Sequence, residues 1–334
     1  MKEVEFKHKM AAHCESGTVT AILNHNGLEI TEPMVFGIAS GIFFGYFESS
    51  NFPFPMFIVR NKPGSIRKNI SKQLGVKFYT KDFKKQQQGI DELNSLIDEG
   101  RPVATQVDFY YMKFLPEYVR THMNVHFVNI VGRNEENYLV SDSYHRTVAE
   151  LDVETLNKAR FVGGYMAPKG FLFYPAYIPE NIGFEKAIIK GIKKAAYNMT
   201  KLPVPFIGVK GIRKFAKKVK TWPELARDID HLSHEIMKIN VFLEDQGTGG
   251  AGFRFLYATF LQQAAQQLNF SQLDDMSKKM MAIGDDWRNI SYFAAKIGKN
   301  RDLGAERLNE LSQMINTMAD QEQVFFTELY KMVK

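Results

Sequence analysis

The sequence predicts an α+β domain followed by a second domain that is almost wholly helical. The chain has 334 residues, enough for two domains of about 150 residues each. Over the first 180 residues the apolar positions mix periods of 2 and 3.6, and beyond them the helical period dominates. In the first part helical patterns precede strand patterns, an order typical of an α+β fold with an antiparallel sheet. We therefore expect domains at residues 1–180 and 181–334.

The first expected element is a helix that begins at the only cysteine of the chain. Cys14 opens a segment in which Val19, Ile22 and Leu23 share one helical face, and Asn26-Gly27 supplies a stop signal. This spacing places Cys14 at a helix N-terminus.

A second helix is expected from Met34 to Tyr46, with Gly37, Gly41 and Gly45 four residues apart on one side. Such a face is smooth, so another backbone or a ligand can approach it closely. It could line a ligand channel or pack against another helix, and both interpretations stay open. A short helix is expected at residues 90–99.

Strand patterns fill the rest of the first domain. Four runs have the composition of strands, and turn residues at positions 134–137 separate the second from the third. The runs are residues 102–111, 125–132, 138–141 and 169–177. The turn predicts that the second and third strands pair as a hairpin.

The second domain begins with helical patterns and ends with one. Thr221 and Glu224 have the spacing of a capping box, and apolar residues then recur every three or four positions from Leu225 to Leu243. The C-terminal stretch 308–332 repeats this pattern, broken only by Glu322. We expect a helical bundle.

The positive charge is concentrated in one segment. The chain carries 43 basic and 37 acidic residues, a net charge of +6, and eleven of the basic residues lie at positions 186–220 with no acidic residue among them. Removing these eleven charges leaves −5 for the rest of the chain. Such a segment is either a solvated helix face or a surface that attracts an acidic partner.

Composition and cysteine count exclude several classes of protein. An apolar share of 45% excludes a disordered chain. A single cysteine excludes an internal disulfide, a zinc ribbon and an iron–sulfur cluster. The opening residues lack the apolar run of a signal peptide, and the apolar stretch 34–47 is shorter than the roughly 18 residues of a membrane span. We expect a cytoplasmic protein with no membrane span.

Cys14 is the first candidate for chemistry. The unpaired N–H groups of a helix N-terminus stabilise a thiolate and can bind a developing oxyanion. The alternative is a small buried apolar side chain, which is the commoner role of an unpaired cysteine. A nucleophile also needs a base and a group that orients the base.

His126 and Asp142 are candidates for those two roles. If the expected hairpin forms, Asp142 at the end of the later strand falls beside His126 near the start of the earlier one. The alternative is a structural histidine and a turn aspartate. His122 and His126 are spaced as metal ligands on a helix, but their surroundings indicate loop and strand, so we expect no metal site.

Two groups of motifs resemble a known family. The N-terminal motifs resemble the N-terminal domain of the butirosin biosynthesis protein H family, and the later motif resembles the helical domain that commonly follows it. The N-terminal motifs are HCESG at residues 13–17, LEITEPMVFGIASGIFFGY at 28–46, and His126-Phe127-Val128 leading to Ser141-Asp142. The later motif is EDQGTGGAGFR at residues 244–254, with Tyr257.

The resemblance implies a papain-like fold in the first domain and an acyltransferase activity. Cys14 would take an acyl group from the phosphopantetheine thioester of an acyl carrier protein, and no cofactor would be bound to the chain itself. His126 would then deprotonate a small-molecule amine or hydroxyl acceptor, with Asp142 fixing the tautomer of the imidazole. Members of the family act in natural-product biosynthesis.

Further residues have candidate roles in such a reaction. Asp108, in an apolar strand, could bind a cationic acceptor or serve as a structural hydrogen-bond acceptor. Gly37 and Gly41 could line a channel for the acyl chain, and Arg254 could bind substrate or anchor a tight interdomain turn. The acidic carrier protein would dock on the basic segment. Its docking residues would be Lys210, Arg213, Lys214, Lys217 and Lys218.

Two other functions remain open on the sequence alone. With water as the acceptor, the same three residues would make a cysteine hydrolase: a peptidase, an amidase or a thioesterase. The chain could instead be a non-catalytic module, with Cys14 inert, whose segment 186–220 binds nucleic acid or an anionic membrane. Nucleic acid is not an expected partner, because the stacking aromatics of such binders are missing. A homo-oligomer is compatible with the sequence.

Overall fold

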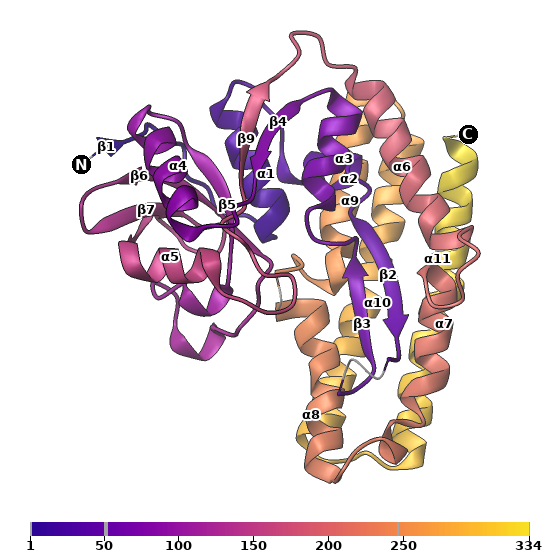
Figure 1. The fold of residues 1–334 in the computed structure, drawn as a ribbon. Coiled ribbons are helices and arrows are strands. Elements are labelled where there is room, and N and C mark those ends of the chain that lie inside the picture. Colours follow the sequence, from indigo (N-terminus) through magenta and orange to yellow (C-terminus); the bar gives the residue numbers. More distant parts are fainter. Residues whose placement is uncertain (1, 50–52, 246, 334) are drawn as a thin grey trace. The chain divides into compact units, whose positions relative to one another are not determined.

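The computed structural model describes residues 2–49, 53–245 and 247–333. The chain divides into two compact units (Figure 1). Unit 1 comprises Met1–Val35 and Ile66–Ile182, and unit 2 comprises Phe36–Ser65 and Gly183–Lys334. The boundary after Ile182 lies close to the expected domain boundary after residue 180. Residues 36–65, which were expected in the first domain, belong to unit 2 instead.

Unit 1 is built on an antiparallel sheet. Its strand order is β4-β9-β5-β6-β7-β8, and β1 also pairs with β6. The strands are β1 (Lys2–Glu3), β4 (Lys77–Lys81), β5 (Val103–Val107), β6 (His126–Arg133), β7 (Asn137–Ser141), β8 (Ala149–Asp152) and β9 (Leu172–Tyr177). Unit 1 also contains the helices α1 (Cys14–His25), α4 (Gln86–Asp98) and α5 (Val153–Phe161), and all but the first residue of α3 (Ser65–Leu74). Helix α2 (Glu32–Ile38) begins in unit 1 and passes into unit 2 after Val35. The predicted α+β class is confirmed.

The pairing of β6 fixes the relative positions of the candidate residues. Val107 of β5 lies opposite His126, the first residue of β6, and Ser141, the last residue of β7, lies opposite Asn129. The predicted hairpin is therefore present, and Asp142 follows directly after β7. Helix α1 packs on β6, and all but the last residue of β6 are buried.

The expected helix from Met34 to Tyr46 is wrong beyond Ile38. Helix α2 ends there, Ser40 takes a left-handed conformation (φ 54°), and residues 42–47 form strand β2 (Ile42–Phe47). The run IFFGYF is aromatic-rich and favours a strand, and it pairs with β3 (Met56–Arg60). Because helix and strand meet within this stretch, the three glycines do not share a helix face.

Unit 2 is a helical bundle that also contains the β2–β3 hairpin, and the predicted helical domain is confirmed. Its long helices pack in pairs, with α7 against α11 and both α8 and α9 against α10. The helices are α6 (Phe184–Thr200), α7 (Gly208–Val219), α8 (Ile229–Asn240), α9 (Arg254–Leu268), α10 (Gln272–Lys299) and α11 (Ala305–Met332). Across the described residues, no helix combines the length and apolar character that a membrane span needs.

Helix α8 begins later than the capping-box spacing predicted. Its N-cap is Asp228, whose Oδ1 accepts a hydrogen bond of 2.7 Å from the backbone N–H of His231. Thr221 instead donates its hydroxyl to the carbonyl oxygen of Lys218, and residues 222–224 form a short 3-10 helix. Asp228 caps the helix because its carboxylate accepts a hydrogen bond from a backbone N–H of the first helical turn.

Candidate functional site

The cysteine occupies the first position of α1, as the sequence predicted. His13 is the N-cap in extended conformation, and its Nδ1 accepts a hydrogen bond of 3.2 Å from the backbone N–H of Ser16. The Sγ atom of Cys14 lies 4.0 Å from the carbonyl oxygen of Val125, the residue before His126. Cys14 is 5% exposed, so its thiol is placed at the start of β6 and largely shielded from water.

His126 and Asp142 form a hydrogen-bonded pair inside unit 1. The imidazole Nε2 of His126 lies 2.7 Å from Oδ2 of Asp142, and neither side chain is exposed. The other carboxylate oxygen of Asp142 accepts the backbone N–H of Tyr144 at 2.9 Å. Both oxygens of Asp142 are therefore held, and the bond to Nε2 fixes the orientation of the imidazole.

The electrostatics of the pair favour a protonated imidazole. Burial of His126 lowers its pKa, but Asp142 and Cys14 together outweigh burial and raise the pKa to about 10. With Nε2 bonded to Asp142, Nδ1 of His126 has no hydrogen-bond partner among the residues the structure describes, and the nearby Cys14 contributes to the raised pKa of the ring. The structure therefore pairs His126 with Asp142 and places the Cys14 sulfur beside the residue that precedes His126.

Two aromatic side chains enclose the imidazole. The ring of Phe109 meets the ring of His126 edge-on at a centroid distance of 4.8 Å, and the ring of Tyr144 lies at 5.4 Å. Aromatic rings around a charged pair exclude water and so strengthen the interaction between the charges. Sequence reasoning missed both residues, although each lies within two positions of an aspartate that it had singled out.

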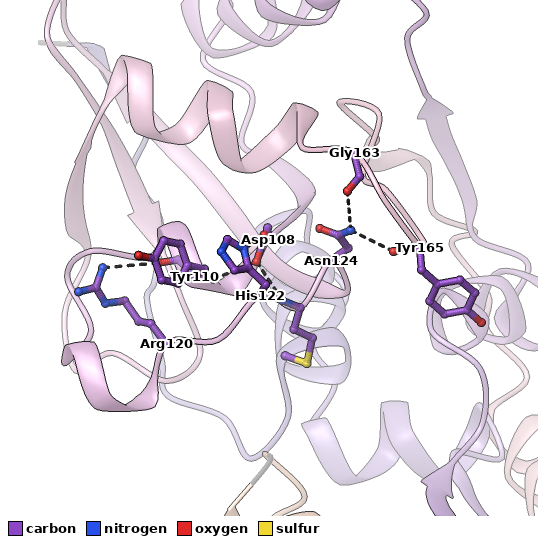
Figure 2. A network of polar contacts seen from close by, with 8 residues as sticks. Asp108, Tyr110, Arg120, His122, Asn124, Gly163 and Tyr165 are labelled. Carbon is purple, nitrogen blue, oxygen red and sulfur yellow. Dashed lines mark hydrogen bonds and ion pairs between the residues drawn. The ribbon is translucent and has the colours of Figure 1, made fainter. Parts of the chain in front are cut away.

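Asp108 holds the segment that carries Phe109 (Figure 2). Its Oδ1 accepts the backbone N–H groups of Tyr110 and Met123 at 3.0 and 2.9 Å, and its Oδ2 lies 2.8 Å from Nδ1 of His122. Asp108 is 1% exposed. Its carboxylate binds backbone N–H groups near the start and near the end of the loop that connects β5 to β6. The contacts support the structural alternative for Asp108 over the binding of a cationic acceptor.

The same region fixes the residues that lead into His126. Asn124 donates its side-chain amide to the carbonyl oxygens of Gly163 and Tyr165 at 3.1 and 2.9 Å (Figure 2). Its own carbonyl oxygen accepts from the side chain of Gln106. The backbone on the N-terminal side of His126 is therefore anchored to strand β5 and to the segment after α5.

His8 supports the other side of the site. Its Nδ1 lies 2.8 Å from the hydroxyl of Ser141, and its Nε2 lies 3.0 Å from the carbonyl oxygen of His145. These two contacts flank Asp142 in sequence. Both ring nitrogens of His8 therefore have partners, and the imidazole stabilises the segment around Asp142. Neither nitrogen is left to donate a hydrogen bond to the oxyanion of a reaction intermediate.

The expected docking residues on α7 are mostly engaged within unit 2. Lys214 and Lys218 pair with the two carboxylate oxygens of Glu48 at 2.8 and 3.1 Å, and Arg213 pairs with Asp320 at 2.7 Å. The ammonium of Lys210 lies 3.3 Å from the carbonyl oxygen of Leu202. Lys217 is exposed and forms no ion pair with any residue that the structure describes. The eleven positive charges are thus partly neutralised inside the fold.

The remaining candidates, Gly37, Gly41 and Arg254, belong to unit 2. A Cβ on Gly37 would meet the ring of Phe260, and one on Gly41 would meet the ring of Phe36. Both glycines therefore allow close packing inside that unit, which is the simpler of the two interpretations of their spacing.

Arg254 is fully buried in unit 2 and paired. Its Nε and terminal nitrogen lie 2.9 and 2.8 Å from Oε1 of Glu322, which also accepts from the indole of Trp287 at 2.7 Å. Another guanidinium nitrogen donates to the carbonyl oxygen of Gly252 in the glycine-rich motif. Arg254 therefore anchors this turn, which lies within unit 2 and not between the two domains as expected. Glu322 is its buried partner.

Comparison with known proteins gives two family matches. The model for butirosin biosynthesis protein H, N-terminal, matches residues 13–143, and the model for a domain of unknown function (DUF4872) matches residues 154–329. None of the curated proteins matches the chain significantly. Among solved structures, one described as a C39-like peptidase from Bacillus anthracis is similar to 54% of this chain and 100% of its own, with 15% identity and a TM-score of 0.40.

Proposed function

Because the chain belongs to the family in which the butirosin biosynthesis protein H N-terminal domain precedes DUF4872, we propose that it is a papain-like cysteine acyltransferase. It moves an acyl group from an acyl carrier protein thioester to an amine or hydroxyl acceptor. The observation that carries the proposal is the buried imidazole of His126, held by Asp142 on one nitrogen, with the Cys14 sulfur 4.0 Å from the carbonyl oxygen of the preceding residue, Val125.

The first step transfers the acyl group to the enzyme. The Cys14 thiolate attacks the carbonyl carbon of the carrier thioester and forms a C–S bond. The backbone N–H of Cys14, in the first turn of α1 where intrahelical acceptors are lacking, stabilises the oxyanion of the tetrahedral intermediate. Collapse breaks the C–S bond to the carrier, and His126 gives its Nδ1 proton to the departing pantetheine thiolate.

The second step transfers the acyl group to the acceptor. Acylation removes the negative charge of Cys14, and with it one of the two groups that raise the pKa of His126. The neutral imidazole then takes a proton from the acceptor as the acceptor attacks the thioester. Departure of the Cys14 thiolate restores the ion pair with protonated His126. The net reaction converts the carrier thioester and the acceptor into a free carrier thiol and an amide or ester.

The donor protein is proposed from charge. Carrier proteins are typically acidic, and electrostatic complementarity speeds transient docking. Several lysines of segment 186–220 are exposed and outside the ion pairs with Glu48 and Asp320, and four of them serve as docking candidates: Lys186, Lys190, Lys217 and Lys220. Their reversal to Glu should weaken carrier binding more strongly at low salt. Unchanged affinity at low salt would reject docking on this segment.

Intact-mass spectrometry tests the transfer directly. The protein is mixed with a panel of acyl carrier proteins that differ in the loaded acyl chain, without an acceptor. We expect a mass increase equal to one acyl group, absent in Cys14→Ala. An adduct that persists in water and is discharged by an added amine supports a transferase. Rapid spontaneous decay would support the hydrolase alternative, and no adduct with any donor would reject the acyl-enzyme.

A further inference from the structure

Glu32 is a partly buried carboxylate that the proposed reaction does not use. It is the first residue of α2, and its two oxygens face the backbone immediately before the nucleophile. Oε2 accepts the N–H of Ala12 at 2.8 Å, and Oε1 accepts the N–H of His13 at 2.9 Å. Burial raises the pKa of Glu32, although these hydrogen bonds counteract the increase.

The same carboxylate also reaches the residues after the nucleophile. The hydroxyl of Ser16 donates to Oε1 of Glu32 at 2.8 Å, and the backbone N–H of Ser16 donates to the N-cap side chain of His13. Glu32 therefore holds the chain on both sides of Cys14, at positions 12, 13 and 16. With these positions fixed, the first turn of α1 cannot rotate, and the direction of the Cys14 side chain is set.

The charge and the hydrogen bonds of Glu32 have opposite consequences for Cys14. A negative charge near a helix N-terminus opposes a second negative charge there, so the charge alone disfavours the thiolate. The hydrogen bonds keep the thiol beside His126, whose positive charge favours the thiolate. Removal of the carboxylate therefore distinguishes the two contributions by the direction of the change.

We propose that Glu32 is a positioning residue that holds Cys14 in register with His126. The proposal rests on the proposed function for its catalytic meaning, but the geometry it describes exists whatever the acyl donor is. Displacement of a reacting group by about 1 Å can cost on the order of 100-fold in rate. The hydrogen bonds to Ala12, His13 and Ser16 are the contacts that prevent such a displacement.

The test is the rate of Cys14 alkylation by iodoacetamide, followed by mass spectrometry from pH 5 to pH 10. Glu32→Gln keeps the size of the side chain but has one acceptor oxygen in place of two. We expect alkylation at pH 6 to fall at least about tenfold and the profile to move toward that of His126→Ala. Glu29→Gln, an exposed carboxylate three residues earlier, is the matched control and should leave the profile unchanged.

Other outcomes would overturn the proposal. Faster alkylation of Glu32→Gln at pH 6 would mean that its charge dominates, and a lower melting temperature with an unchanged profile would mean a purely structural role. If Glu32→Gln does not fold, Ser16→Ala removes the hydroxyl, with its contacts to Glu32 and to Nδ1 of His13, and should shift the profile in the same direction by a smaller amount. No shift would count against the proposal. Because alkylation needs no carrier protein, failure of acyl transfer leaves this test valid.

Discussion

The Nε2 atom of His126 lies 2.7 Å from Oδ2 of Asp142 in a place where neither side chain is exposed to solvent. A buried charge is stable only when it is paired and hydrogen bonded. The pair therefore links stability to pH as well as organising the site. The pKa of His126 is raised from 6.5 in the unfolded chain to about 10 in the folded protein.

The direction of this pKa shift fixes the pH dependence of stability. A pKa that is higher in the folded state means that protonated His126 stabilises the fold. This contribution is complete below pH 6.5 and is lost as the pH rises toward 10. The difference in free energy of unfolding between the wild type and His126→Gln should therefore shrink from pH 6 to pH 10. Urea denaturation at several pH values measures it, and a constant difference would contradict the shift.

Substitution of Asp142 should separate its charge from its hydrogen bond. Asp142→Ala removes both and should lower the rate of acyl loading by about 10²-fold or more. Asp142→Asn keeps an oxygen that can accept from Nε2 and should give an intermediate rate. Single-turnover loading measured for both variants checks this order. Equal loading rates for Asp142→Ala and the wild type would mean that Asp142 has no role in the reaction.

Gly17 should not tolerate a side chain. A Cβ at this position would lie 2.5 Å from Cβ of Ala11 and 3.2 Å from Cβ of Ser143, next to Asp142. Gly17→Ala should lower the free energy of unfolding by about 1–3 kcal/mol and slow Cys14 alkylation. Gly163→Ala, where a Cβ meets no atom within 4 Å, is the control. If the two variants have equal stability, this packing argument is incorrect.

The buried pair in unit 2 should be destabilised by the loss of one partner. Arg254→Met leaves the carboxylate of Glu322 buried without its cation and should cost about 3–5 kcal/mol in free energy of unfolding. The double variant Arg254→Met, Glu322→Leu removes both charges and should recover part of that loss. Denaturant titration of the single and double variants gives the coupling energy. No recovery in the double variant would mean that the two charges do not stabilise each other.

Local patterns predicted the elements that carry the site. The helix that starts at Cys14 and the hairpin of β6 and β7 depend on apolar spacing and turn residues within a few positions. The hairpin then implied that His126 and Asp142 lie close together. The C-terminal helix was predicted by the same reasoning, because its apolar face runs over seven turns.

The features that the sequence did not predict depend on distant partners. The glycine spacing in residues 34–46 fits a helix locally, but strand β3 pairs with residues 42–47 and overrides it. Assignment of residues 36–65 to unit 2 is likewise set by packing far along the chain. Glu32 contacts Ala12 and His13 from beyond the whole of helix α1, and no local motif signals a carboxylate that binds backbone N–H groups so far away in the sequence.

In the proposed mechanism Cys14 reacts as a thiolate paired with protonated His126, and the pH profile of its alkylation is the test of that pairing. The wild type should react with iodoacetamide at pH 6 at a rate close to its rate at pH 8, because His126 stays protonated over that range. His126→Ala should react slowly at pH 6 and gain rate only as the pH rises toward that of a free thiol, near 8.5. Identical profiles for the two proteins would contradict the ion pair.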